Sequence, residues 1–255
     1  MADPNSTKAT YEKYWAAFQE SAQYHPANRF RYKLVVSILR RYLRPGMTVV
    51  DMGCGDANLL WFLKQRCRGP VYYGCDVSHH VIELNRQQKS GIFFFQADVA
   101  SPDFLSQAAA AGVAGCDIVV CSEVIEHVEE DQMVLNNAYG LLKPSGRLIL
   151  TTQSGPRYRV DLELLHHLRH YDRRCLEQMV IQAGLAIIDS FNCGFPLLTL
   201  QKVLVDAVFD WVKRAVASSK RPTRLARGIM AGMYYAMLVS PRMFGPQLVL
   251  LGRKP

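Results

Sequence analysis

The sequence contains no apolar run long enough to cross a lipid bilayer. Its longest apolar stretch lies near Gly228–Ser240, where Gly232 interrupts it and Pro241 ends it. At about 13 residues, this stretch is shorter than the roughly 20 residues that a membrane-spanning helix requires. The first ten residues are polar and lack a basic region followed by an apolar one, so we expect no secretory signal.

Paired cysteine motifs are also absent. The seven cysteines form no C-x-x-C pair and have no zinc-like spacing, and Cys75, Cys116 and Cys121 lie inside apolar runs. An odd number of cysteines, mostly in apolar surroundings, favours reduced thiols over a disulfide framework. We therefore expect a cytoplasmic protein, either free or peripheral to a membrane.

An even distribution of charge is missing as well. Hydrophobic residues make up 49% of the 255 residues, which is enough to bury a core and excludes disorder as the main state. Residues 201–255 contain ten basic and two acidic side chains, whereas residues 1–200 contain twenty of each sign. The net charge of +8 thus belongs to the C-terminal part, which indicates an anionic partner, a membrane surface or a role in solubility.

Between Met47 and Gln153, short apolar runs alternate with segments of helical periodicity. This alternation is typical of an α/β protein, with a parallel sheet and helices on both faces. The expected strands are Thr48–Asp51, Val71–Asp76, Ile92–Ala97, Asp117–Ser122 and Arg147–Gln153. The expected helices are Asn58–Gln65, His80–Lys89, Phe104–Ala111 and Asp131–Leu142.

The flanking regions are mostly helical. Residues 11–43 indicate two helices broken at His25-Pro26, and residues 154–171 indicate a loop. After the loop we expect a helix at Arg173–Ala183, a strand at Ala186–Phe191, a basic helical stretch at Leu197–Val239 and a last strand at Leu248–Gly252. The chain is expected to form a single domain, made of an N-terminal helical lid (1–45), a core (46–192), a basic apolar cap (193–245) and the last strand (246–255).

The strongest local signal is the segment Val49–Asn58, VVDMGCGDAN, in which a buried strand leads through an acidic residue to Gly53 and Gly55. Glycines at such a turn let a ligand approach the backbone amides at the start of the next helix. The second strand ends at Asp76, and Asp98 follows the third. Carboxylates at successive strand ends, one of them placed to accept ribose hydroxyls, indicate a nucleoside site at the carboxyl edge of the sheet.

These segments resemble the class I S-adenosylmethionine-dependent methyltransferases, from about residue 11 to residue 254. The resemblance rests on VVDMGCGDANL, YYGCDVS, FQADV, DIVVCSEVIEHV, LLKPSGRLILTT and RHYDRRCLEQMVIQAGL. It implies a Rossmann-like, mostly parallel sheet of seven strands whose last strand is antiparallel. It also implies S-adenosyl-L-methionine as the cofactor, held by Asp51, Gly53, Gly55, Asp76, Val77, Asp98, Val99 and, at the end of the fourth strand, Ser122 or Glu123.

In this family the acidic residue after the second strand holds the ribose, and the residues after the third strand lie near the adenine. One departure from the family pattern is Ala57, where a third glycine is common. A dinucleotide-binding dehydrogenase is the competing interpretation, but that class requires Gly-x-Gly-x-x-Gly and this sequence has Asn58 at the last position. We therefore prefer the methyltransferase interpretation.

Glu123, Glu126 and His127 have the spacing that places side chains on one face of a helix. Such a face can bind Mg²⁺ or another divalent ion, or present a general base. Two similar groups use a divalent ion, namely the ubiquinone-pathway O-methyltransferases and the small-RNA 3′-terminal 2′-O-methyltransferases. The RNA group adds a later histidine, for which His170 is the candidate here. Alternatively, His127 lines the floor of the pocket and no metal is bound.

The candidate catalytic residues are therefore His127, His170 and Glu126, and the candidate metal ligands are Glu123, Glu126, His127 and His170. His170 belongs to a basic cluster with His166, His167 and Arg169, placed where acceptors enter in this family. The plainer alternative is that His170 is a packing residue in front of a helix that Asp172 caps.

The N-terminal segment carries Tyr11, Tyr14 and Trp15 at helical spacing. Similar aromatic helices in this family form a lid over the cofactor, and Tyr14 is the best candidate for such a contact. A stripe that packs into the core is the commoner meaning of this spacing. Arg29 and Arg31 either hold an acidic acceptor or lie in solvent, and the sequence favours neither.

Residues 197–244 combine apolar and basic side chains, which suits a helical cap on the sheet, an acceptor pocket or contact with a membrane surface. Soft and aromatic side chains in the cap predict a small, largely apolar acceptor. These side chains are Phe195, Leu197, Leu198, Met230, Met233, Tyr234, Tyr235, Met237 and Met243.

We expect methylation of oxygen in preference to nitrogen or carbon, because imidazoles and carboxylates gather at the expected acceptor site. One alternative is a metal-assisted RNA 2′-O-methyltransferase that uses the basic C-terminal part for phosphate contacts. No RNA-binding module is recognisable, however, and the basic residues alternate with apolar ones, so a nucleic acid partner is disfavoured. Another alternative is a partner protein that binds the cofactor without catalysis, against which the intact Glu126, His127 and His170 argue.

Overall fold

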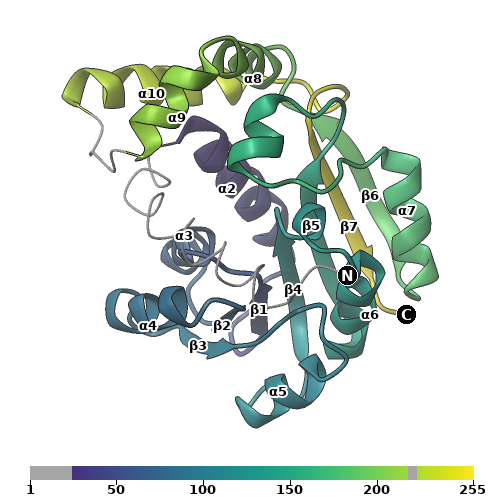
Figure 1. Ribbon diagram of the computed structural model, residues 1–255. Helices are drawn as coiled ribbons and strands as arrows, with labels where there is room; N and C mark the ends of the chain where they lie inside the picture. The colour runs from purple at the N-terminus through teal and green to yellow at the C-terminus, as the bar shows by residue number, and fades with distance from the viewer. Residues whose placement is uncertain (1–24, 218–222) are drawn as a thin grey trace.

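A seven-stranded sheet forms the centre of the protein in a computed structural model, which describes residues 25–217 and 223–255 (Figure 1). The strand order is β3-β2-β1-β4-β5-β7-β6. β1 to β5 are mutually parallel, and β7 pairs antiparallel with both β5 and β6, so the expected fold is confirmed. The strands are β1 (Thr48–Met52), β2 (Val71–Asp76), β3 (Phe93–Gln96), β4 (Cys116–Ser122), β5 (Leu142–Gln153), β6 (Ala186–Cys193) and β7 (Gln247–Arg253).

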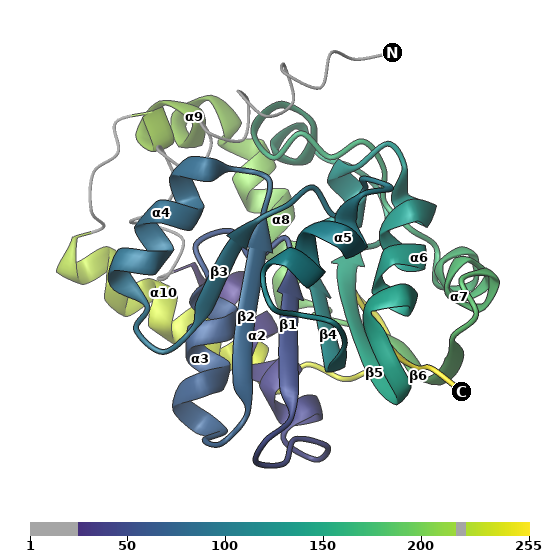
Figure 2. The same ribbon diagram turned by 90° about the horizontal axis from the view of Figure 1, so that it is seen from below.

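Helices cover both faces of the sheet (Figure 2). One face is packed against α2, α3, α8 and α10, and the other against α5, α6 and α7. The helices are α2 (Pro26–Leu39), α3 (Asn58–Arg66), α4 (His79–Gln88), α5 (Phe104–Ala110), α6 (Asp131–Leu141), α7 (Arg173–Gln182), α8 (Leu197–Ala207), α9 (Phe209–Ala217) and α10 (Arg224–Met237).

The central strands are apolar on both faces because each face is covered. Val49 of β1 lies in the core below α2 and α3, whereas its neighbour Val50 lies in the opposite core. Ile118 and Val119 of β4 divide in the same way. Successive side chains of a strand point to opposite faces, so a strand buried on both faces has a continuous apolar run.

The parallel strands end at nearly the same level. Met52 of β1 is paired with Cys75 of β2 and Cys121 of β4, and Ser122 is paired with Thr151 of β5. The residues that follow these strands therefore lie along one edge of the sheet. This edge carries the glycine turn and the acidic residues that the sequence singled out.

The region expected to be one basic helical stretch contains three helices, α8, α9 and α10. We call residues 193–245 the cap, as above, and these helices form a layer at the top of Figure 1. α10 packs against α2 and also contacts α8, while α9 follows α8. Among the described residues, no helix is both long and apolar enough to span a membrane.

Candidate active site

The glycine turn after β1 is fixed to the end of β2. The amides of Gly53 and Cys54 both donate to the carbonyl of Cys75, at 2.9 and 2.8 Å. Gly53 has a φ of +75°, and a Cβ on this residue would lie 2.6 Å from a methyl group of Val124. Both the left-handed backbone and the close approach of Val124 thus require glycine at this position.

Ala57 also has a left-handed backbone, with a φ of +52°, directly before α3. This conformation is costly for a residue with a Cβ atom, which explains why glycine suits this position in the family. The departure seen in the sequence therefore changes the residue without removing the turn.

Acidic side chains lie at the ends of β1 and β2, where the sequence predicted them. Asp76 accepts hydrogen bonds from the amides of Gly55, at 2.9 Å, and Ser78, at 3.0 Å, and burial raises its pKa. Asp51 is 2% exposed, and burial together with the neighbouring Asp76 carboxylate raises its pKa to about 7. The structure thus brings the predicted turn and two of the predicted acids together.

The end of β3 completes this arrangement. Asp98 is exposed and accepts a hydrogen bond from the amide of Ala100 at 2.9 Å. Val99 is buried and Val77 is half-buried. All three lie directly after β2 or β3, beside the edge that carries the glycine turn.

Glu123 is the centre of a polar network at the end of β4. Its carboxylate accepts hydrogen bonds from Gln153, from Gln247 at 2.9 Å and from Thr151 at 3.3 Å. Burial alone raises the pKa of Glu123, but the Arg31 guanidinium and the two amides lower it below its ordinary value. Ser122 contributes a hydroxyl that bonds to Thr151 at 2.8 Å. Glu123 is therefore held as a carboxylate by groups from three elements, α2, β5 and β7.

Arg31 of α2 belongs to this site. Its side chain is 12% exposed, and Nη1 lies 3.6 Å from the Glu123 carboxylate. Arg29 instead lies over the ring of Tyr234 in α10, with its guanidinium carbon 4.4 Å from the ring centre. The sequence could not distinguish the two arginines, but in the structure Arg31 faces the site and Arg29 faces the cap.

Glu123, Glu126 and His127 do not share a helix face, so that prediction was wrong. Glu123 has a left-handed backbone, with a φ of +55°, and only Ile125–His127 form a short 3₁₀ turn. The left-handed backbone of Glu123 therefore keeps this residue out of any helix that contains Glu126 and His127.

Glu126 is completely buried, and one oxygen accepts a hydrogen bond from Thr152 at 2.8 Å. Its other oxygen, Oε1, has no hydrogen-bond partner in residues 25–217 and 223–255. Burial and the nearby Glu123 charge raise the pKa of Glu126 well above its ordinary value.

Two histidine rings, those of His127 and His167, lie next to Glu126, and the ring of His170 follows them. The rings of His127 and His167 meet edge to face with centres 4.7 Å apart, and Nδ1 of His167 lies 2.9 Å from Nε2 of His170. Nδ1 of His170 is 3.0 Å from the carbonyl of Gly155. Burial lowers the pKa of His127 to about 4 and that of His167 to about 2, so both imidazoles are neutral at pH 7.

Within residues 25–217 and 223–255, two groups of side chains could each hold a metal ion. The ligand atoms of Glu126, His127 and His167 lie within 4.8 Å of one another, and so do those of Asp161, His167 and His170. The expected set of Glu123, Glu126, His127 and His170 thus does not come together as one group. His167 takes the place that the sequence assigned to His170, and Glu123 is occupied by its own network.

Asp161 was missed by the sequence analysis. It lies in a π-helical turn, Val160–Leu164, inside the segment expected to be a loop, and it is completely buried. Its carboxylate accepts hydrogen bonds from Lys202 of α8, at 3.1 and 3.3 Å, and from the amide of Tyr158 at 2.9 Å. No local pattern identifies this residue, because its partner lies 41 residues further along the chain.

Arg169 lies apart from the histidine rings. It pairs with Asp131 at 2.8 Å and donates to the carbonyl of Glu129. The Tyr171 hydroxyl donates to the same Asp131 carboxylate at 2.7 Å. These bonds attach the histidine segment to the start of α6. Asp172 caps α7 as expected, by accepting from the amide of Arg174.

The apolar residues expected to form the acceptor pocket divide into three groups. Leu198, Tyr234 and Met237 are buried in the core below the cap. Phe195, Tyr235 and Met243 are exposed, and the remaining three, Leu197, Met230 and Met233, are half-buried. The expected lid residues Tyr11, Tyr14 and Trp15 lie outside the described residues.

Comparison with known proteins identifies the family. A family model described as a methyltransferase domain matches residues 27–190. Ubiquinone biosynthesis O-methyltransferases of Haemophilus ducreyi and Coxiella burnetii are 29% identical over 109 residues and 28% identical over 149 residues. These alignments cover 42% and 54% of this chain, and 45% and 60% of the relatives, so the chain spans about half the length of the curated relatives it matches.

Solved structures support the fold. An S-adenosylmethionine-dependent methyltransferase of Thermotoga maritima is 17% identical, with a TM-score of 0.63 over 98% of this chain and 100% of that one. A phosphoethanolamine N-methyltransferase of Haemonchus contortus, solved with S-adenosyl-L-methionine, has a TM-score of 0.53 at 15% identity, over 94% of this chain and 60% of that one. With the family model matching more than half of the sequence, the chain belongs to the methyltransferase-domain family.

Proposed function

We propose that this chain is an S-adenosylmethionine-dependent methyltransferase that transfers a methyl group to a hydroxyl oxygen of a small, largely apolar acceptor. The observation that carries the proposal is the buried cluster of Glu126, His127 and His167, one turn beyond the end of β4. Such a cluster suits a hydroxyl acceptor, which must lose a proton when it is methylated. The O-methyltransferase names of the two curated relatives support the same choice of atom.

The residues at the edge of the sheet fit S-adenosyl-L-methionine. Gly53 and Gly55 have positive φ values, which let the chain turn tightly before α3, and we propose that the cofactor lies against this turn. We propose that the Asp76 carboxylate, which keeps lone pairs beyond its two amide bonds, accepts the ribose hydroxyls. Asp51, Val77, Asp98, Val99 and Ser122 complete the proposed cofactor site.

When bound, the cofactor supplies a methyl group on a positively charged sulfur. The chain's own contribution is to align the acceptor with this group and to exclude water, because displacement at carbon depends mostly on orientation. Glu123, held by Arg31, Gln153 and Gln247, places a fixed negative charge beside the turn. We propose that the proton lost by the acceptor hydroxyl is taken up at the cluster of Glu126, His127 and His167, by a neutral imidazole when that cluster holds no ion.

We further propose that Glu126, His127 and His167 hold a divalent ion. Glu126 Oε1 is buried and lacks a hydrogen-bond partner among the described residues, as a vacant metal ligand does. Two imidazoles and one carboxylate suit a transition metal better than Mg²⁺, which prefers oxygen ligands. His170, bonded to His167, orients that ring.

The half-buried cap residues support an apolar acceptor. α8 lies next to the histidine cluster, because its Lys202 bonds to Asp161, whose carboxylate lies 3.8 Å from His167 and 3.9 Å from His170. Leu197, Met230 and Met233 are soft or apolar side chains that are not fully packed. Methionine repacks readily around irregular apolar ligands.

The test is a turnover assay with pooled phenolic, catecholic and amine acceptors, read as S-adenosylhomocysteine formed with and without a chelator. We expect turnover with hydroxyl acceptors, lost with the chelator and restored by a transition metal. His167→Ala should abolish metal-dependent turnover. The control is His166→Ala, which replaces the preceding, exposed histidine and should retain metal-dependent turnover. Methylation of amines alone would contradict the proposed hydroxyl acceptor. Methylation of hydroxyl acceptors that continues in the presence of the chelator would contradict the proposed metal ion.

A further inference from the structure

The cap exposes an unusual amount of apolar surface. In the described parts of the chain, 13 of the 20 large hydrophobic side chains that are exposed belong to residues 195–244. Single exposed apolar side chains are normal, but a concentration of them indicates an interaction surface. They are Phe195, Leu200, Val203, Leu204, Val208, Trp211, Leu225, Ile229, Tyr235, Leu238, Val239, Met243 and Phe244.

α10 has two apolar faces, and the fold uses only one of them. Tyr234 and Met237 are 7% and 1% exposed and lie in the core shared with α2. Leu225 and Ile229, one helical turn apart, are 76% and 58% exposed on another face. The same face continues through Gly232 and Ala236 to Val239, just past the helix, which is 82% exposed. The outer stripe therefore has no role in holding α10 on the sheet.

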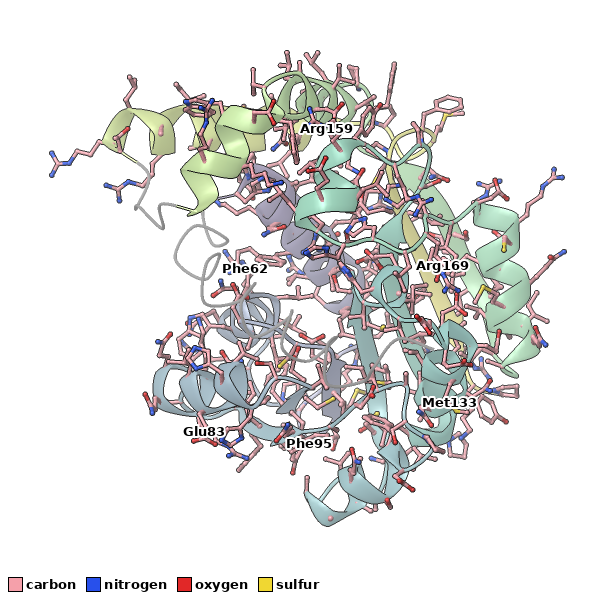
Figure 3. All side chains as sticks on the ribbon, viewed as in Figure 1. Phe62, Glu83, Phe95, Met133, Arg159 and Arg169 are labelled. Carbon is pink, nitrogen blue, oxygen red and sulfur yellow. The ribbon has the colours of Figure 1, made fainter. Side chains whose placement is uncertain are left out.

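The charges around this stripe are predominantly positive. Arg224 and Arg242 are exposed basic residues of the cap, and Figure 3 shows nitrogen-tipped side chains projecting from the end of α10. Asp206 and Asp210, the acidic residues of the cap, both bond to Arg159, which is outside the cap. Asp206 accepts from the backbone amide of Arg159 and Asp210 pairs with its guanidinium, so among the described residues neither carboxylate pairs with the exposed Arg224 or Arg242.

We propose that the cap docks on an anionic phospholipid bilayer, with the outer stripe of α10 in the interface and the basic side chains among the headgroups. A helix that lies in a membrane interface has this combination of an apolar face and flanking basic residues. A second copy of the chain would bring two positive surfaces together, so charge complementarity favours the lipid. The proposal concerns a partner and holds whichever atom the enzyme methylates.

The test is co-sedimentation of the full chain with vesicles, without cofactor or acceptor. We expect binding to vesicles of phosphatidylcholine with phosphatidylglycerol, weaker binding to pure phosphatidylcholine and weaker binding at high salt. Ile229→Asp should lower the partition coefficient about tenfold or more. Its matched control is Ile181→Asp in α7, because Ile229 and Ile181 are 58% and 57% exposed, and this control should bind as the unmodified chain does.

Charge is tested with a second pair. Arg224→Glu should weaken binding to anionic vesicles only, whereas Arg174→Glu at the exposed start of α7 should not. Unchanged cofactor binding by calorimetry shows that each variant is folded. Equal binding to neutral and anionic vesicles, or equal losses in the two isoleucine variants, would overturn the proposal. So would an Ile229→Asp variant that changes from dimer to monomer while its vesicle binding stays the same.

Discussion

The amide of Gly55 donates a 2.9 Å hydrogen bond to the carboxylate of Asp76, which lies 21 residues further along the chain. The bond joins the turn after β1 to the end of β2 inside the buried edge of the sheet. Since the proposed cofactor site uses both segments, their relative position is set before any ligand arrives.

Asp76→Ala should weaken the binding of S-adenosylmethionine. It removes the proposed ribose acceptor and leaves the amides of Gly55 and Ser78 without their partner, which we expect to cost about 1–3 kcal/mol of binding free energy. Calorimetry measures the change. Asp103→Ala, at an exposed position before α5, should bind the cofactor normally, and equal affinities of the two variants would contradict the assignment.

Gly53→Ala should lower the free energy of unfolding by about 2–4 kcal/mol, because left-handed strain adds to overlap with Val124. Gly46→Ala is the control, since Gly46 has a φ of +82° and nothing within 4 Å of a Cβ. This control should show the strain alone. Combining Gly53→Ala with Val124→Ala should recover part of the loss in urea denaturation, and no recovery would show that Val124 is not the obstacle.

The stability of the protein should depend on pH through Asp51. Burial and the Asp76 charge raise the pKa of Asp51 from 3.8 to about 7. Between pH 4 and pH 7, the folded chain therefore keeps a proton on Asp51 that the unfolded chain has already released. The stabilising contribution is therefore complete near pH 4 and is lost as the pH rises through 7, with a slope of up to about 1.4 kcal/mol per pH unit.

Asp51→Asn should remove this part of the pH dependence, measured as the free energy of unfolding in urea between pH 5 and pH 8. Asp76, Asp56 and Arg31 surround Asp51 and stay in the variant, so the difference between the two curves isolates one residue. Parallel curves for the variant and the unmodified chain would show that Asp51 is already ionised below pH 5.

Lys202→Met should destabilise the protein by about 3–5 kcal/mol, because it leaves the buried Asp161 carboxylate without its cation. Lys213→Met is a close control, since Lys213 pairs with Glu163 of the same π-helical turn, but both side chains are about half exposed. Removing that exposed pair should cost much less stability than removing the buried one, because solvent screens it. Thermal unfolding of both variants compares the two, and similar losses would contradict the distinction.

The glycine turn and the acidic strand ends could be predicted because each depends on a few adjacent residues. A strand that runs into Gly53 and Gly55 has few other conformations available, and parallel strands bring Asp51 and Asp76 to the same edge. The spacing of Glu123 and Glu126 was misleading, since helical periodicity does not reveal a left-handed residue at the end of a strand.

The partners of the histidine cluster could not be predicted from local pattern. His167 was identified within a cluster, but its preference over His170 depends on how residues 154–171 fold back against the 3₁₀ turn. Asp161 depends on Lys202 of α8, and Arg31 became part of the site only through the packing of α2. Each of these contacts joins segments that are far apart in the sequence. Hydrophobic periodicity describes only neighbouring residues, so it could not predict them.

The position of β7 has a consequence for the order in which the chain can fold. β7 lies between β5 and β6, and its first residue, Gln247, donates to Glu123 in the active site. During synthesis on the ribosome, β5 and β6 cannot pair with β7 until about residue 253 has left the exit tunnel, so the edges that will bind β7 stay unpaired until then. A nascent chain can therefore form the glycine turn early, but it gains a complete Glu123 network only when β7 pairs with β5 and β6.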